Sequence, residues 1–123
     1  MSSFKNNVKS ANAGIRYFFQ TERNGRIQAI VSSIILLVSW FFGINRFEWC
    51  LVIFCIALVM SLEMVNTALE RVCAMLSTEY HPMVKIIKDV AAGAVWWASI
   101  FCIIIGAIIF LPYVMKFFNL QIT

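Results

Sequence analysis

The 123-residue sequence has few charged residues, and this scarcity excludes a soluble globular protein. Asp, Glu, Lys and Arg make up 13% of the chain, whereas 62% of it is hydrophobic. A chain of this size has too little polar surface to cover a soluble globule. The protein must therefore contact lipid.

Glycine-rich phosphate-binding loops are also missing. The five glycines are isolated at positions 14, 25, 43, 93 and 106, and neither GxxxxGK[ST] nor GxGxxG occurs. Soluble nucleotide-binding domains use such loops to bring backbone N–H groups close to the phosphates. ATP binding of the soluble type is thereby excluded.

The sequence also shows no paired-cysteine motif and no pattern typical of a signal peptide. The four cysteines, at positions 50, 55, 73 and 102, show no CxxC or Cys/His spacing, so we expect small buried hydrophobic side chains and neither a disulfide nor a metal site. The N-terminus is polar, and the first apolar run ends in aromatic residues rather than a small-residue cleavage site, so we expect no signal peptide.

What the sequence does have is long apolar runs. Uncharged stretches cover 27–45, 49–62 and 90–115, and a hydrocarbon core of roughly 30 Å needs about 20 apolar residues of helix. The middle run reaches this length when it is extended to residue 76. The sequence predicts an all-α membrane protein, one domain over 1–123, with spans at about 27–45, 48–76 and 84–115.

A polar segment of about 3–24 precedes the first span and has helical periodicity. Its apolar residues recur every three or four positions: Phe4, Val8, Ala11, Ile15 and Phe18. Basic residues fall between them, which predicts an amphipathic helix on the membrane surface. Gly25 would let this helix turn into the first span. A turn around Gly43 and Asn45 would join the first two spans, and Pro82 suits the start of the third helix.

Basic residues are distributed unequally between the two sides of the predicted spans. One side carries Lys5, Lys9, Arg16, Arg23, Arg26, Arg71, Lys85 and Lys88, and the other carries Arg46 and Lys116. Cytoplasmic flanks carry the excess of Lys and Arg. This predicts a cytoplasmic N-terminus and 76–87 connection, with the C-terminus outside.

The second span carries a polar stripe. On a helix, Glu63, Asn66 and Glu70 stand above one another on one face. Ionisable groups in a membrane helix are costly and normally face a bundle interior or a polar cavity. One interpretation is structural, with both carboxylates paired to Arg or Lys of neighbouring helices. The other is a functional site.

Further polar residues are expected at the same depth. Glu22 ends the surface helix, and Lys88 and Asp89 open the third span, so these residues could converge with the polar stripe. Mg²⁺ takes carboxylate oxygens together with substrate phosphates. Four acids with few local bases therefore indicate a magnesium–nucleotide site.

The sequence resembles the small three-span prokaryotic diacylglycerol kinases and their undecaprenol kinase relatives. The family motif is a Glu, any residue, an aliphatic residue, Asn, Ser/Thr, a small residue, an aliphatic residue and Glu, and residues 63–70 match every specified position. Downstream of this motif, the sequence has Glu79-Tyr80-His81 and Lys88-Asp89 at the same spacing as in the family. Cys73-Ala74 replaces the Val-Asp that follows the motif in the family, and Ser3 stands where the family often has an Arg.

The resemblance implies phosphoryl transfer from MgATP to the primary hydroxyl of a membrane lipid, within a homotrimer in the bacterial inner membrane whose sites combine neighbouring subunits. Glu63 would be the catalytic base and Asn66 would orient groups beside it. Glu22 and Glu70 would hold Mg²⁺ and belong to the nucleotide site. The remaining implied nucleotide contacts are Glu79, Tyr80, His81, Lys88 and Asp89. No nucleic-acid partner is expected.

Two alternatives stay open at this point. A small channel or transporter subunit could use the same carboxylates as an ion or proton relay. Within the kinase interpretation, diacylglycerol and undecaprenol both present a primary hydroxyl, and the sequence does not distinguish them. Instead of binding the nucleotide, His81 could be an exposed loop residue and Tyr80 could anchor the chain at the lipid headgroups. For Trp96-Trp97, lipid-facing packing is favoured over a substrate pocket.

Overall fold

The computed structural model describes residues 3–76 and 81–119, and its regular structure there is helical. The elements are α1 (Phe4–Thr21), α2 (Arg23–Phe42), α3 (Arg46–Leu76) and α4 (Pro82–Phe117). Three of them, α2, α3 and α4, are long and apolar enough to cross a membrane. The prediction of an all-α, multi-pass membrane protein is confirmed.

Local sequence signals explain where the helices begin and end. Gly43 adopts a left-handed conformation (φ 63°) that ends α2, as glycine does most readily. Asn45 and Glu48 then exchange hydrogen bonds: the Glu48 N–H donates to Asn45 Oδ1 at 2.8 Å, and the Asn45 N–H donates to Glu48 Oε1 at 3.0 Å. This reciprocal cap starts α3. Pro82 is the first residue of α4, as the sequence predicts.

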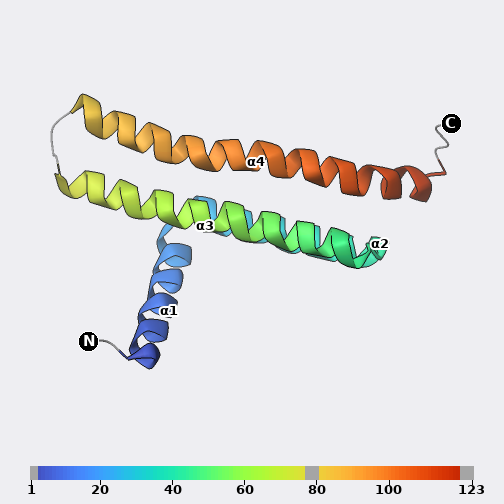
Figure 1. Ribbon diagram of the computed structural model, residues 1–123, viewed down its shortest axis with the longest axis horizontal. Coiled ribbons are helices and arrows are strands. Elements are labelled where there is room, and N and C mark those ends of the chain that lie inside the picture. The colour runs from blue at the N-terminus through green and yellow to red at the C-terminus, as the bar shows by residue number, and fades with distance from the viewer. Residues whose placement is uncertain (1–2, 77–80, 120–123) are drawn as a thin grey trace.

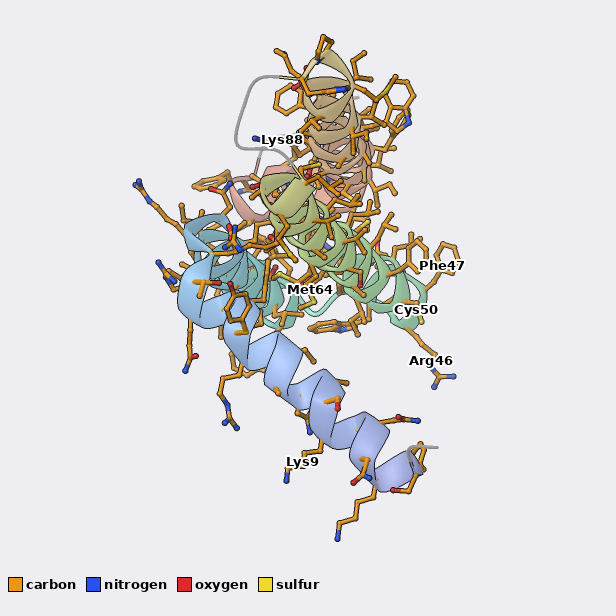
Figure 2. The ribbon with its side chains drawn as sticks, turned by 90° about the vertical axis from the view of Figure 1, so that its left-hand side faces the viewer. Lys9, Arg46, Phe47, Cys50, Met64 and Lys88 are labelled. Carbon is orange, nitrogen blue, oxygen red and sulfur yellow. The ribbon has the colours of Figure 1, made fainter. Side chains whose placement is uncertain are left out.

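The three long helices lie side by side, whereas α1 runs crosswise to them (Figure 1). α3 and α4 are antiparallel and form the most extensive helix pair. The view along the bundle shows α1 leading away from the long helices, with Lys9 projecting from it (Figure 2). At the opposite end of the bundle, Arg46, Phe47 and Cys50 project outward from the start of α3.

The junction of α1 and α2 differs from the prediction. The chain turns at Glu22, whose backbone is extended (φ −105°, ψ 113°), and Gly25 lies inside α2. The predicted surface helix of 3–24 therefore ends at Thr21, and the first long helix begins at Arg23, four residues before position 27. Gly25 serves packing instead of turning: a Cβ there would lie 2.5 Å from the ring of Phe18, which is buried.

Apolar side chains are buried mainly near the α2–α3 turn. Ile44, Val52 and Ile109 form a buried cluster, and Trp49 and Tyr113 are among the residues that pack against it. Most other large hydrophobic side chains face outward, as expected for helices surrounded by lipid. Among these are Leu37, Trp96, Trp97 and Ile103.

Candidate functional site

Glu63 is a buried carboxylate in the C-terminal half of α3. Its side chain is 6% exposed, and its Oε2 accepts a hydrogen bond from Gln28 Nε2 at 3.1 Å. Gln28 lies in the second turn of α2, so this bond joins two helices that are antiparallel neighbours. A carboxylate in this environment is costly unless a donor or a substrate satisfies it.

Asn66 stands one turn after Glu63 and is 7% exposed. Its Nδ2 donates to Glu70 Oε1 at 2.9 Å. Its Oδ1 is buried and has no hydrogen-bond partner among the residues that the structure describes. Buried polar atoms normally have a partner, so an acceptor without one marks a place where another molecule can donate.

Glu22 meets the C-terminal half of α3 from the break between α1 and α2. Its Oε1 forms an ion pair with Arg71 Nη2 at 2.6 Å, and Arg71 Nε donates to Tyr17 Oη at 3.2 Å. The carboxylates of Glu22 and Glu70 lie close enough to Glu63 to act on it electrostatically. The structure therefore brings Glu22, Glu63 and Glu70 together where α1, α2 and α3 meet.

The residues predicted on α4 lie apart from these carboxylates in a single chain. Asp89 forms an ion pair with Lys85 at 2.6 Å, and both side chains are exposed. Lys88 projects sideways from the N-terminal part of α4 (Figure 2). Within the described ranges, neither Lys88 nor Asp89 has a hydrogen bond or ion pair with Glu22, Glu63 or Glu70.

The connection before α4 is described only in part. His81 Nδ1 accepts from the Met83 backbone N–H at 3.1 Å, so the imidazole caps the helix. Glu79 and Tyr80, both expected at the nucleotide, lie outside the described residues.

The donor set suits a hard divalent cation, although one chain does not complete a cage for it. Across residues 3–76 and 81–119, no group of three His, Cys, Asp or Glu side chains is placed to hold a metal ion. Mg²⁺ commonly binds through one or two carboxylates and completes its coordination with water and substrate phosphates. Glu22 and Glu70 offer two such carboxylates, and the unpaired Asn66 Oδ1 lies beside Glu70, so the residues present fit this mode.

Two residues of the cluster were not predicted as site residues. Arg71 was considered only for its charge, and Gln28 was not considered. The available signal for Gln28 is its amide within an otherwise apolar run of 27–45, since polar groups in membrane helices usually have a partner.

An apolar groove of about 320 Å³ begins next to this cluster and runs between α2, α3 and α4. Gln28, Ser32 and Ser99 contribute its polar side chains, and most of its lining is aliphatic. The groove therefore joins the polar cluster to the apolar interior of the bundle.

Comparison with known proteins shows the family to which the chain belongs. The family model described as "Prokaryotic diacylglycerol kinase" matches residues 9–110. The undecaprenol kinase of Bacillus subtilis (strain 168) is 33% identical over 112 residues, which cover 91% of each chain. A diacylglycerol kinase of Synechocystis sp. is 37% identical over 101 residues, 81% of this chain and 58% of the relative. A diacylglycerol kinase of Haemophilus influenzae is 31% identical over 106 residues, 85% of this chain and 90% of the relative. This chain belongs to the prokaryotic diacylglycerol kinase family.

Proposed function

We propose that this protein is a lipid kinase that transfers the γ-phosphate of ATP to the primary hydroxyl of a membrane lipid, undecaprenol or diacylglycerol. Family membership and the names of the relatives support the lipid kinase activity. The observation that carries the chemistry is the Glu63–Asn66–Glu70 stripe, in which the buried Glu63 carboxylate lies beside Asn66 Oδ1, an acceptor with no partner in the part of the chain that the structure describes.

Glu63 accepts the proton of the lipid hydroxyl in this proposal. It is the deepest acid of the stripe, seven residues or roughly 10 Å along the helix from Glu70. Its side-chain donor from α2, Gln28, is neutral, and among residues 3–76 and 81–119 no Lys, Arg or His forms an ion pair with this carboxylate. The hydroxyl has one proton, which goes to Glu63, so the unpaired Oδ1 of Asn66 remains an acceptor beside the reacting group for another donor of the bound nucleotide or a water.

Glu22 and Glu70 would hold Mg²⁺ together with the phosphates of the nucleotide. The ion neutralises charge on the transferring phosphoryl group when it is bound. Glu70 Oε1 accepts a hydrogen bond from Asn66 Nδ2, and Glu22 forms an ion pair with Arg71. These contacts hold both carboxylates in position. Arg71 must release or share Glu22 when the ion binds.

The nucleotide-binding site would be completed by residues around the start of α4, namely Glu79, Tyr80, His81, Lys88 and Asp89. In one chain Lys88 and Asp89 do not contact the carboxylates. A homotrimer in which α4 of one subunit meets α3 of its neighbour would bring the two sets together, and the small residues 91–94 permit close helix contact. Full activity of a protein that cross-linking shows to be monomeric in mild detergent would contradict the trimer.

The proposed location is the bacterial inner membrane, with α1 lying on its cytoplasmic surface. The distribution of basic residues supports this orientation, and the exposed Phe4, Val8 and Ile15 of α1 would enter the interface. Alkaline phosphatase fused to the C-terminus should be active, because that end lies outside. An inactive C-terminal fusion alongside an active N-terminal one would reverse the orientation.

The activity is tested with purified protein, radiolabelled ATP and each lipid in turn. Phosphate transfer to diacylglycerol or undecaprenol, dependent on magnesium, is the expected result, and the ratio of the two rates identifies the preferred lipid. A channel or transporter subunit, which the comparisons do not favour, would transfer phosphate to neither lipid. That outcome, obtained with a folded protein, would overturn the proposal.

A further inference from the structure

Gln28 is the side chain through which α2 reaches the proposed base. Its Nε2 donates to Glu63 Oε2 at 3.1 Å, across 35 positions of sequence. Gln28 is half-buried and Glu63 is 6% exposed, so water competes little for the bond. A hydrogen bond to a charged acceptor in such surroundings is stronger than one between neutral groups.

The chemistry of an amide donor suits a carboxylate that must accept a proton. An Arg or Lys at this position would pair with the carboxylate and reduce its basicity, whereas an apolar residue would leave it free to rotate. The amide N–H fixes one carboxylate oxygen without neutralising its charge and leaves Glu63 Oε1 for another donor.

The direction of the bond is also informative. Gln28 approaches Glu63 from α2, whereas Asn66 bonds to Glu70 on α3 itself. The two amides therefore donate to different carboxylates, although the Asn66 amide also lies close enough to Glu63 to interact with it. Gln28 also lines the apolar groove between α2, α3 and α4, so it stands where apolar surface gives way to the polar cluster.

We infer that Gln28 is the positioning residue of Glu63, holding that carboxylate in the orientation that accepts the lipid hydroxyl proton. This inference rests on the proposed role of Glu63. Gln28 acts on the reaction only through Glu63 and touches neither the nucleotide nor the metal.

The test compares Gln28→Met, which keeps the length of the side chain and removes its donor, with Ser32→Ala. Ser32 lies one turn further along α2 and lines the same groove. Its hydroxyl has no bond to Glu63 among the described residues. Gln28→Met should lower kcat about tenfold and leave KM for ATP within twofold, because Glu63 is no longer held in the orientation that accepts the proton. Ser32→Ala should keep kcat within twofold.

A double variant shows whether Gln28 acts through Glu63. Once Glu63→Gln has removed the base, adding Gln28→Met should cause no further loss of kcat, since residues that act as one unit are not additive. A further tenfold loss in the double variant, or a Gln28→Met protein with normal kcat, would overturn the inference. So would a change confined to KM for ATP.

Failure of the inference is distinguishable from failure of the proposed base. An inactive Glu63→Gln with an unaffected Gln28→Met refutes only the role of Gln28, whereas a fully active Glu63→Gln refutes the base and the inference together. Oligomer size and thermal unfolding are measured on every variant. If Gln28→Met does not assemble, Gln28→Leu takes its place, because its side chain has a similar volume and no hydrogen-bonding group; normal kcat in Gln28→Leu would equally refute the role.

Discussion

The two halves of α3 each hold a glutamate in a polar contact, but the surroundings differ. Near the start of the helix, Glu48 Oε1 accepts from the Asn45 N–H and from the hydroxyl of Tyr113, next to the cluster of Ile44, Val52 and Ile109. In the C-terminal half, Glu63 accepts from one side chain, Gln28, and lies beside the unpaired oxygen of Asn66.

This difference distinguishes the structural polar contact at Glu48 from the candidate functional site at Glu63. Around Glu48, two donors bond to the same carboxylate oxygen next to a packed apolar cluster, so we expect this contact to stabilise the fold. Around Glu63, acceptors outnumber donors and three carboxylates gather, an arrangement that a cation and a hydroxyl would satisfy. Substitutions around Glu48 should therefore change stability, and those around Glu63 should change turnover.

The largest contrast is expected between Glu63→Gln and Glu48→Gln. Glu63→Gln should lower kcat by about 10²-fold or more, the scale of a general base, with oligomer size and ATP affinity retained. Glu48→Gln should lower the thermal unfolding temperature and keep kcat within twofold. A folded Glu63→Gln protein with near-normal kcat would remove the base assignment.

A smaller effect on turnover is expected at the proposed metal ligands. Glu22→Gln and Glu70→Gln each remove a charge while keeping shape, and should raise the magnesium concentration needed for half-maximal activity by about tenfold while lowering kcat. The matched control is Glu48→Gln, whose magnesium titration should stay unchanged. Unchanged titrations in both site variants would place the ion elsewhere.

At the other end of the bundle, Ile109→Ala should affect stability alone. Ile109 is 4% exposed in the apolar cluster, and its truncation should cost about 1–3 kcal/mol, mainly through lost packing. Ile103→Ala is the control, because Ile103 lies on the same helix and is 71% exposed. Thermal unfolding in detergent and kcat are measured together. Equal unfolding temperatures for the two variants would show that this cluster does not stabilise the bundle.

The smallest effect is expected for Tyr113→Phe, which deletes the hydroxyl that donates to Glu48. The unfolding temperature should fall by less than in Ile109→Ala, because the Asn45 N–H still donates to the same carboxylate. Activity should not change. A loss of kcat in Tyr113→Phe would show that the two ends of the bundle are coupled.

Hydropathy and helical periodicity predict the long helices and place Glu63, Asn66 and Glu70 on one face, because these depend on spacing within one helix. Contacts between helices depend on how each is rotated against its neighbour, and a single sequence does not give that rotation. This is why the Gln28–Glu63 bond and the Glu22–Arg71 pair were not predicted. The turn at Glu22 instead of Gly25 has a similar origin, since Phe18 occupies the space beside the glycine.

The unequal lengths of the long helices relate the site to the thickness of the bilayer. α2 has 20 residues, about 30 Å, which is roughly the hydrocarbon thickness, whereas α3 has 31 residues and exceeds it by roughly 16 Å. A thinner bilayer would be accommodated by tilting of α2, and a thicker one by thinning of the bilayer around this helix. Either response would strain the contact between Gln28 and Glu63, so we expect activity to be highest in vesicles whose acyl-chain length matches α2 and to decline on either side of that length.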